Sequence, residues 1–337
     1  MRLATIRPRT PAGVLPPRDG QLVVVSPDGA TGALVPDYSN LLFAIEHWER
    51  AEPALRRVEE RLRGGTWEAT VDLAAETFMA PLPRTWAWLD GSAFLHHVLL
   101  VRKARGAEPP DDLYDVPLMY QGVSDNFLGP TDDIPLLDEA HGMDFESEVA
   151  VIVDDVPMAV SAADAAGHVK LLVVMNDVSL RELIPRELAA GFGFFQSKPA
   201  SSFAPFAVTP DEAGDAWRDG RLHLEMCSRL NGREFGRPHA GAMHFSFHDL
   251  IAHAARTRAL SPGTIVGSGT VSNDDEAAGS SCIAERRMIE KIAGGTPRTP
   301  WMRGGDTVEV EMRQGDRSLF GKIAQRVVLQ KAPVHAK

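Results

Sequence analysis

A strand-like segment with two glutamates near its start reads Met143-Asp144-Phe145-Glu146-Ser147-Glu148-Val149-Ala150-Val151-Ile152-Val153. Its β-branched residues predict a β-strand, and a strand sends residues i and i+2 to the same face. We therefore expect Glu146 and Glu148 to point in the same direction. Two neighbouring carboxylates repel each other and raise each other's pKa unless a cation lies between them, so the pair indicates a metal site.

A second apolar run, residues 169–175, ends in Asn176-Asp177 and places a third carboxylate at the end of a strand. Three oxygen donors without a thiol favour a hard divalent cation. The alternative is that the paired acids face solvent on an edge strand and that Asp177 is an ordinary turn residue. This stretch alone leaves both interpretations open.

Composition limits the classes of protein to consider. The 337 residues with 44% hydrophobic content predict one large or two unequal globular domains. Lys and Arg total 35 against 46 Asp and Glu, and the net charge of -11 argues against a nucleic-acid partner. No apolar run has the length of a signal peptide or of a membrane helix, so we expect a cytoplasmic protein without membrane contact. Cys227 and Cys282 are too few for a disulfide framework or a zinc ribbon.

The pattern of short strands predicts the domain organisation. Residues 1–37 carry strand-like pieces broken by Pro and Gly, and the helical pattern that follows has Ser39 or Asn40 as its cap and an interruption at Pro53. We expect residues 1–80 to form a small N-terminal β module plus a connecting helix, and residues 81–337 to form the catalytic domain. Many strands with few helices between them predict a mixed, mainly β (α+β) fold.

Several motifs, in this order along residues 85–330, resemble those of the fumarylacetoacetate hydrolase family. They are Met119-Tyr120-Gln121-Gly122, Glu146-x-Glu148, Asn176-Asp177-Val178-Ser179-x-Arg181, Ser197-Lys198, Gly267-Ser268-Gly269-Thr270-Val271-Ser272 and Gly305-Asp306. The resemblance implies a fumarylacetoacetate hydrolase-like catalytic β-roll behind a small N-terminal domain, a homodimer and a divalent cation. It leaves magnesium, calcium and manganese open as the metal.

The same resemblance assigns roles to residues by their place in the motifs. The implied metal ligands are Asp90, Glu146, Glu148 and Asp177. Asp90 and His97 keep the spacing of metal aspartate and catalytic histidine in the branch that includes fumarylacetoacetate hydrolase itself, in which the histidine pairs with a glutamate, here Glu285. The remaining implied roles belong to Lys198 as the catalytic lysine, Tyr120 as a substrate-binding tyrosine and Thr270 as a contact of the substrate carboxylate.

Each of these residues also has a purely structural explanation. We expect a helix from Gly91 to Arg105, which Asp90 could cap. His97 would then be a core histidine on an apolar helix face. Lys198 before a proline could be an exposed loop lysine, and Glu285 beside two arginines could form a surface ion pair.

Departures from the family pattern concern the substrate. Ile184 stands where the fumarylacetoacetate-cleaving branch has a glutamine, and Ser92 stands in place of an active-site tyrosine. The family's substrate-binding arginine falls on Gly106, which leaves Arg102 or Arg105 as candidates for that role. The aliphatic side chain at 184 favours an apolar substrate group at that contact, so the expected substrate is not fumarylacetoacetate itself.

Three classes of function follow. The first is a metal-dependent hydrolase that cleaves a carbon–carbon bond in a β-diketone or acylpyruvate, as in aromatic catabolism. The second is a decarboxylase, hydratase or isomerase of a small 2-oxo acid on the same scaffold. The third is a zinc hydrolase that uses His244, His248 and His253, two of which have zinc-like i, i+4 spacing but lack the glutamate of a His-Glu-x-x-His motif.

Overall fold

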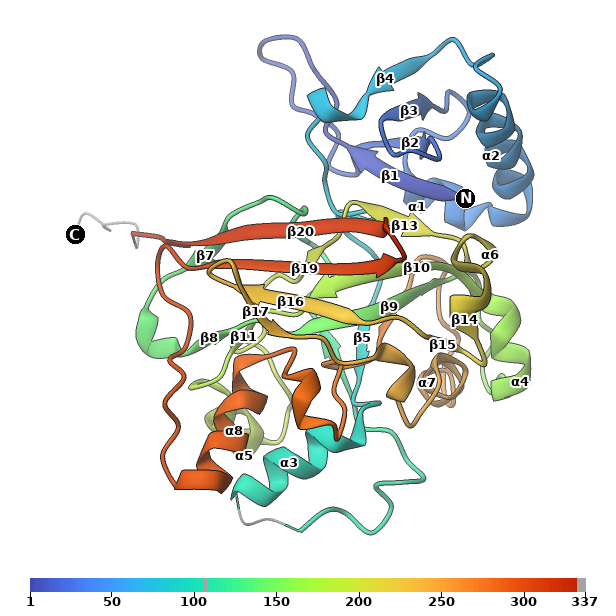
Figure 1. The fold of residues 1–337 in the computed structure, drawn as a ribbon. Coiled ribbons are helices and arrows are strands. Elements are labelled where there is room, and N and C mark those ends of the chain that lie inside the picture. The colour runs from blue at the N-terminus through green and yellow to red at the C-terminus, as the bar shows by residue number, and fades with distance from the viewer. Residues whose placement is uncertain (106–107, 332–337) are drawn as a thin grey trace, which may run out of the picture.

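The computed structural model describes residues 1–105 and 108–331, and these form the expected mixed, mainly β fold (Figure 1). The chain begins with a small module of four strands and two helices. These elements are β1 (Arg2–Ile6), β2 (Gln21–Val25), β3 (Thr31–Leu34), α1 (Leu41–Glu46), α2 (Trp48–Arg63) and β4 (Thr70–Asp72).

The rest of the described chain is built mainly of strands. The strands are β5 (Trp88–Gly91), β6 (Met119–Gly122), β7 (Ile134–Leu136), β8 (Met143–Asp144), β9 (Ser147–Val153), β10 (Val169–Asn176), β11 (Ser179–Leu180), β12 (Ser202–Phe203), β13 (Phe206–Val208), β14 (Trp217–Arg218), β15 (Arg221–Leu222), β16 (Met226–Leu230), β17 (Arg233–Gly236), β18 (Ile265–Gly267), β19 (Thr307–Gln314) and β20 (Arg317–Leu329). The helices are α3 (Leu95–Arg105), α4 (Ala162–Ala165), α5 (Ile184–Ala190), α6 (Pro210–Ala213), α7 (Phe247–Ala254) and α8 (Ile283–Gly294). None of the described helices is long and apolar enough to span a membrane.

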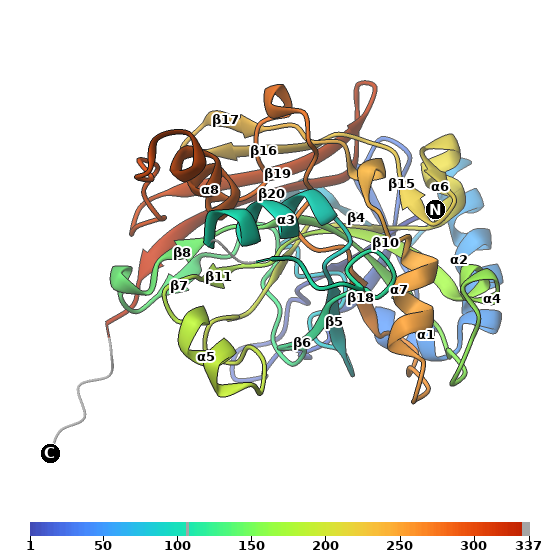
Figure 2. The same ribbon diagram turned by 90° about the horizontal axis from the view of Figure 1, so that it is seen from below.

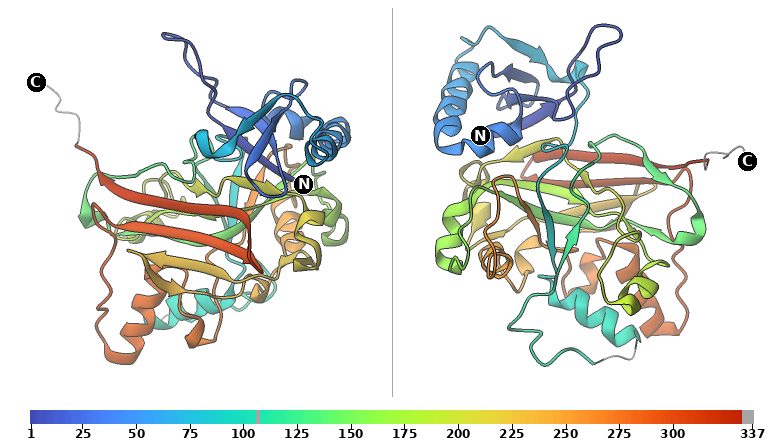
Figure 3. Two further views of the ribbon diagram at one scale, coloured as in Figure 1. Left: turned by 45° about the horizontal axis from the view of Figure 1, so that its top comes forward. Right: turned by 180° about the vertical axis from the view of Figure 1, so that it is seen from behind.

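Two large sheets organise the structure. One follows the order β4-β3-β2-β1-β13-β10-β9-β18-β5-β6, with β12 also paired to β10, and the other follows β17-β16-β19-β20-β7. The module of residues 1–80 is therefore hydrogen-bonded to the rest through β1 and β13, in the register Leu3↔Ala207. In both views of Figure 3 this module (blue) lies at one end of the molecule, and helices α3 and α8 lie at the opposite end.

Strands β9 and β10 lie at the centre of the large sheet and are buried on both faces. Alternate residues of β10 enter two different cores: Leu172 and Val174 join the main core of the catalytic part, whereas Leu171 and Val173 join the core beneath α1 and α2. A strand covered on both faces needs apolar side chains at odd and even positions. This explains why both strands read as nearly continuous apolar runs in the sequence.

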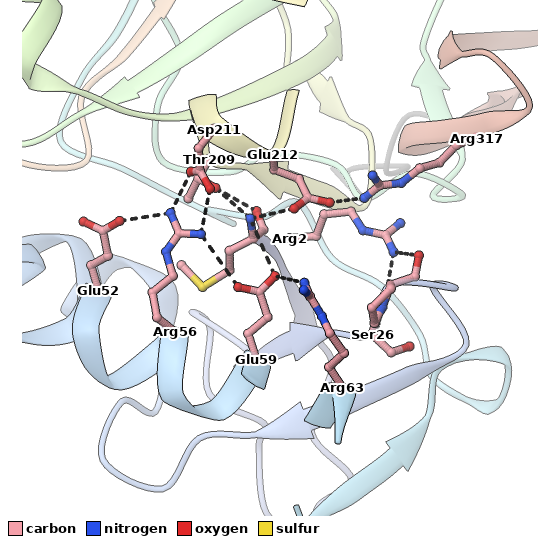
Figure 4. Close-up of polar contacts among 12 residues, drawn as sticks. Arg2, Ser26, Glu52, Arg56, Glu59, Arg63, Thr209, Asp211, Glu212 and Arg317 are labelled. Carbon is pink, nitrogen blue, oxygen red and sulfur yellow. Dashed lines mark hydrogen bonds and ion pairs between the residues drawn. The ribbon is translucent and has the colours of Figure 1, made fainter. Parts of the chain in front are cut away.

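Ion pairs add a second link between the N-terminal module and the catalytic part (Figure 4). Arg56 of α2 forms two bonds to Asp211 of α6, with Nη1–Oδ2 at 2.9 Å and Nη2–Oδ1 at 2.6 Å. Next to this pair, and within the catalytic part itself, Glu212 accepts a bond from Arg317 of β20. The bidentate geometry fixes the direction of α2, although exposed ion pairs of this kind contribute at most about 1 kcal/mol each.

Two helix boundaries differ from the sequence prediction. Asn40 is the N-cap, since its side chain accepts a bond from the Phe43 amide at 2.8 Å, but the break between α1 and α2 lies at His47, and Pro53 lies inside α2. The helix expected from Gly91 begins only at Leu95, because Gly91 ends the strand β5. Asp90 is therefore a strand residue and no helix cap.

Gly267 gives a test of how closely β5 and β18 pack. A Cβ atom on Gly267 would lie 2.2 Å from Cη2 of Trp88 and 2.6 Å from Oδ1 of Asp90, and both residues are buried. We predict that Gly267→Ala lowers the free energy of unfolding by about 1–3 kcal/mol, the usual cost of overpacking a core. Urea denaturation measures it. The control Gly167→Ala, where nothing lies within 4 Å of the added Cβ, should change stability by less than about 0.5 kcal/mol.

Candidate active site

A cavity of about 510 Å³ opens between the strand ends and the helices α3, α5 and α8. Figure 2 shows α3 and α8 side by side, and the two helices pack against each other. Most of the residues singled out from the sequence line this cavity: Asp90, His97, Arg102, Tyr120, Glu146, Glu148, Ile184, Lys198 and Thr270. Two further candidates, the metal ligand Asp177 and the partner of His97, Glu285, contact residues of this lining.

Three carboxylates converge at the floor of the cavity. Asp90, Glu148 and Asp177 each offer an oxygen, and these atoms lie within 4.8 Å of one another. Sheet topology brings them together: Glu148 pairs with Met175 across β9 and β10, and Asp90 reaches the same place because β18 links β5 to β9. The fold thus gathers one acid from β5, one from β9 and one from the residue that follows β10.

The bonding of Glu148 is incomplete. The residue is fully buried, and neither of its oxygens has a hydrogen-bond donor among the described residues. Burial raises the pKa of Glu148 well above its usual value, and the negative charge of Asp90 raises it further. Burial and the charge of Asp177 have the same effect on the pKa of Asp90. Buried carboxylates without a donor fit a divalent cation, because oxygen ligands of this charge are what hard cations bind.

Glu146 differs from its neighbour. Its carboxylate contacts Arg181 and lies 2.7 Å from Nζ of Lys198. Burial alone would raise the pKa of Glu146, but the two positive charges outweigh burial and lower it to about 2. The group of oxygens within 4.8 Å of one another does not include Glu146, so its assignment as a direct metal ligand stays a prediction.

Lys198 is held between two carboxylates. Its Nζ also lies 2.5 Å from Oδ2 of Asp177, and the side chain is almost fully buried. Burial would lower the pKa of Lys198, but the charges of Asp177 and Glu146 outweigh that effect and raise it above its usual value. Lys198 is thus a fixed positive charge at the cavity wall and not an exposed loop lysine.

His97 and Glu285 form the expected pair. Nδ1 of His97 lies 3.0 Å from Oε2 of Glu285, whose side chain is 1% exposed. His97 comes from α3 and Glu285 from the first turn of α8, so the packing of these helices sets the distance. With Nδ1 donating to the carboxylate, the lone pair of the ring lies on Nε2. Glu285 forms no surface ion pair with Arg286 or Arg287.

The residues implied to bind substrate occupy different parts of the wall. The Tyr120 hydroxyl donates to Oδ2 of Asp177 at 2.6 Å, and its ring packs edge-on against Phe194. Ile184 begins α5 and is buried. Arg102 donates to the carbonyl of Glu108 at 2.9 Å. Gly106, together with the side chain of Arg105, lies outside the described part of the chain.

Sequence reasoning missed three supporting residues. Arg181 bridges Asp144 and Glu146, with its Nε 2.9 Å from Oδ2 of Asp144. Ser201 donates to Oδ1 of Asp177 at 2.8 Å. Asp144 precedes Glu146 by two residues, and Arg181 follows Asp177 by four, so both were visible as polar positions beside the predicted ligands. No local signal marks Ser201.

The three histidines proposed as zinc ligands are not brought together. Over residues 1–105 and 108–331, the only group of three or more His, Cys, Asp or Glu side chains close enough to hold a metal is the carboxylate triad. Nε2 of His244 instead lies 2.9 Å from the carbonyl of Tyr114. Ser246 and Asp249 form a capping box at the start of α7, so this stretch folds as an ordinary helix terminus. The zinc-hydrolase prediction is wrong.

Comparison with known proteins identifies the family of the chain. Residues 87–328 match the family model "Fumarylacetoacetate (FAA) hydrolase C-terminal". The chain belongs to the fumarylacetoacetate hydrolase family. Residues 1–84 match the model "Fumarylacetoacetase N-terminal domain 2".

Similar proteins in this family carry different activities in their names. The human mitochondrial oxaloacetate tautomerase FAHD2B is 27% identical over 202 residues, which cover 58% of either chain. The 2,4-didehydro-3-deoxy-L-rhamnonate hydrolase of a Sphingomonas strain is 26% identical over 197 residues, or 58% of this chain and 60% of that protein. The chain thus spans about three fifths of these relatives. A family of hydrolases, isomerases and tautomerases does not by itself fix the reaction of this chain.

Solved structures share the fold over nearly the whole chain. Maleylpyruvate hydrolase from Sphingobium sp. SYK-6, solved with manganese(II) and pyruvate, has a TM-score of 0.65 at 19% identity. A 5-carboxymethyl-2-hydroxymuconate delta-isomerase from Mycobacterium smegmatis has a TM-score of 0.62 at 17% identity. Each alignment covers 98% of this chain and 100% of the other. At this identity the likeness concerns the fold alone.

The unbonded carboxylate of Glu148 leads to a prediction about stability in chelated, metal-free protein. Because folding raises the pKa of Glu148 above the ordinary value of 4.5, the folded state holds the proton more tightly than the unfolded state. This contribution to stability is present below pH 4.5 and is lost as the pH rises through the raised pKa. We predict that Glu148→Gln is more stable than the wild type at neutral pH, and that the difference grows with pH.

Added divalent cation should make the wild type more stable than Glu148→Gln. Wild-type protein should gain about 2.7 kcal/mol at a metal concentration of 100 times Kd, while Glu148→Gln should gain much less. Thermal unfolding at several pH values, with chelator and then with Mn²⁺ or Mg²⁺, gives both quantities. Equal metal-induced stabilisation of the two proteins would remove Glu148 from the metal site.

Proposed function

We propose that the protein is a metal-dependent hydrolase that cleaves a carbon–carbon bond in a β-diketone or an acylpyruvate. The observation that carries this proposal is the His97–Glu285 pair, 3.0 Å apart, in the same cavity as the carboxylate triad. Hydrolysis needs a base for water beside a site that stabilises negative charge on oxygen. These two features meet in this cavity.

Asp90, Glu148 and Asp177 would hold the cation, with Glu146 beside them as a fourth carboxylate. A bound magnesium, calcium or manganese ion supplies Lewis acidity, which orients a 1,3-dicarbonyl and polarises the carbonyl that is attacked. Tyr120 and Ser201 hold the orientation of Asp177, and Gly269 donates its amide to Asp90 at 3.0 Å. Such outer contacts fix a ligand set before the ion arrives.

His97 takes the proton from water through Nε2, while Glu285 stabilises the imidazolium that results. The hydroxide oxygen bonds to the carbonyl carbon, and the adjacent carbon–carbon bond breaks. Its electron pair passes to the departing fragment as an enolate, which takes the proton back from Nε2 of His97 and leaves as a ketone or 2-oxo acid, and the attacked carbonyl leaves as a carboxylic acid. Lys198 stabilises the negative oxygen, whose charge is larger in the transition state than in the bound substrate.

A second candidate is enolisation or isomerisation of a 2-oxo acid, or its decarboxylation or hydration, which uses the cation and Lys198 without a hydrolytic water. The named activities of the human tautomerase and of the isomerase from Mycobacterium smegmatis favour this candidate. Product analysis separates the two. Chelated and re-metallated protein should be given a panel of acylpyruvates, β-diketones and oxaloacetate, and only hydrolysis incorporates one oxygen from labelled water into a new carboxylate.

His97→Ala tests the proposed base. We expect kcat for acylpyruvate hydrolysis to fall by about 10²–10⁴, the usual loss for a general base, with metal content unchanged. His96→Ala is a matched control on the same helix, since Nδ1 of His96 lies 2.8 Å from Ser272 Oγ and His96 is no part of the cavity lining. Full hydrolysis by metal-loaded His97→Ala would point to another base.

Ile184→Gln tests substrate specificity. Ile184 is buried in the cavity wall and cannot bond a substrate oxygen, and an unpaired buried oxygen costs about 1–3 kcal/mol. The wild type should therefore prefer alkyl- or aryl-substituted diketo acids to fumarylacetoacetate by roughly ten- to a hundredfold in kcat/KM. Ile184→Gln should narrow this gap, and Ile184→Leu should preserve it. A wild type that prefers fumarylacetoacetate, with no effect of the glutamine, would contradict the prediction.

A further inference from the structure

The first turn of α8 is capped by a carboxylate from a distant strand. The N-cap residue is Cys282, whose sulfur accepts a bond from the Glu285 amide at 3.3 Å. The first two amides of the helix, those of Ile283 and Ala284, donate to Asp144 of β8 at 2.7 and 2.9 Å. Thiol sulfur is a weak acceptor, and amides at a helix start need strong ones. Asp144 therefore carries most of the capping.

Asp144 also connects this helix to the charged cluster at the metal carboxylates. Its Oδ2 lies 2.9 Å from Nε of Arg181, and the other end of that guanidinium contacts Glu146. Glu146 in turn pairs with Lys198. Asp144 is completely buried, so its position is set by these partners and not by solvent.

Glu285 belongs to this capped first turn. Glu285 is the third residue of α8, and in a common capping box a glutamate there turns back to the N-cap amide. Here the N-cap residue Cys282 forms an isolated antiparallel β-bridge with Glu146, and this bridge holds the segment before the helix. With Asp144 holding the helix start, the Glu285 carboxylate extends instead to Nδ1 of His97.

We propose that Asp144 is the positioning residue of the His97–Glu285 pair. Asp144 contacts neither member of the pair, and it acts by fixing the first turn of α8 relative to the cluster that holds the cation. This inference rests on the proposed hydrolytic function. A displacement of Glu285 by about 1 Å is enough to cost roughly a hundredfold in rate when the base loses its orientation.

Asp144→Asn is the main test, because the amide has the same shape, keeps one acceptor oxygen and loses the charge. We expect kcat for hydrolysis to fall by about ten- to a hundredfold, while KM and the Mn²⁺ affinity measured by calorimetry stay close to wild type. Asp144→Ala should show a larger fall in kcat than Asp144→Asn. If the alanine variant does not fold, the asparagine variant alone decides the proposal.

A second substitution tests whether the capping itself is responsible. Serine is a stronger helix cap than cysteine, so Cys282→Ser in the Asp144→Asn background should restore part of kcat. A role of Asp144 in stability alone would leave kcat of the folded asparagine variant at the wild-type value and would overturn the proposal. Parallel loss of kcat and Mn²⁺ affinity would also overturn it, since Asp144 would then serve the metal site.

His97→Ala, measured beside these variants, separates the two levels of the argument. If His97→Ala loses hydrolysis and Asp144→Asn does not, the inference about Asp144 fails and the proposed function stands. If neither variant loses hydrolysis, His97 is not the base and the inference about Asp144 fails with it, whereas a wild type that hydrolyses no member of the panel would contradict the proposed function itself.

Discussion

The site depends on an imbalance of buried charge. Five buried carboxylates, those of Asp90, Asp144, Glu146, Glu148 and Asp177, share the two cationic side chains of Arg181 and Lys198. Excess negative charge in a medium of low dielectric constant is costly, and proteins remove that cost by protonation or by a bound cation. In metal-free protein the raised pKa values of Glu148 and Asp90 favour protonation. A divalent cation balances the cluster, so ion binding and folding stability should be coupled.

The pairing of strands in the large sheet holds these acids close together. Strand β9 pairs with β10 on one side and with β18 on the other, and β18 carries β5. Hydrogen-bonded strands cannot drift apart, so the acids at their ends stay close in spite of their repulsion. Gly267 permits the approach, because any Cβ there would collide with Asp90 and Trp88. The apolar packing on both faces of β9 and β10 provides the energy that holds the arrangement.

Local sequence pattern predicted the part of the site that lies on these central strands. Glu148 and Asp177 adjoin long apolar runs, and that context makes a buried carboxylate visible in the sequence. Asp90 precedes a glycine and a helical pattern and reads locally as a helix cap, so its assignment to the metal site came only from the family resemblance, and its place in the parallel strand pair of β5 and β18 was not predicted. The division of the chain at residue 80 stays a prediction, although β1 and β13 join the two parts in one sheet.

Other features depend on contacts that no local pattern contains. Glu146 and Glu148 look equivalent in the sequence, yet two cations from later segments bind Glu146 and leave Glu148 unbonded. The same holds for Asp144, whose partners lie at the start of α8. The break at His47 was misplaced at Pro53 because proline is a strong helix-breaking signal in isolation. The core beneath α2 outweighs that local preference.

The groups proposed to stabilise an enolate and those proposed to activate water come from different parts of the fold. This separation suggests how one family can contain hydrolases, isomerases and tautomerases. In the proposed mechanism a negative oxygen is stabilised by the carboxylate triad, whose residues lie on strands of the large sheet or just after one, and by Lys198, which lies in the segment before β12. In the same mechanism water is activated by His97 and Glu285, which lie on α3 and α8. A change in these helices would remove hydrolysis and leave enolate chemistry intact. In this chain both parts are present, and Asp144 and Arg181 connect them, which is why hydrolysis is the reaction we propose.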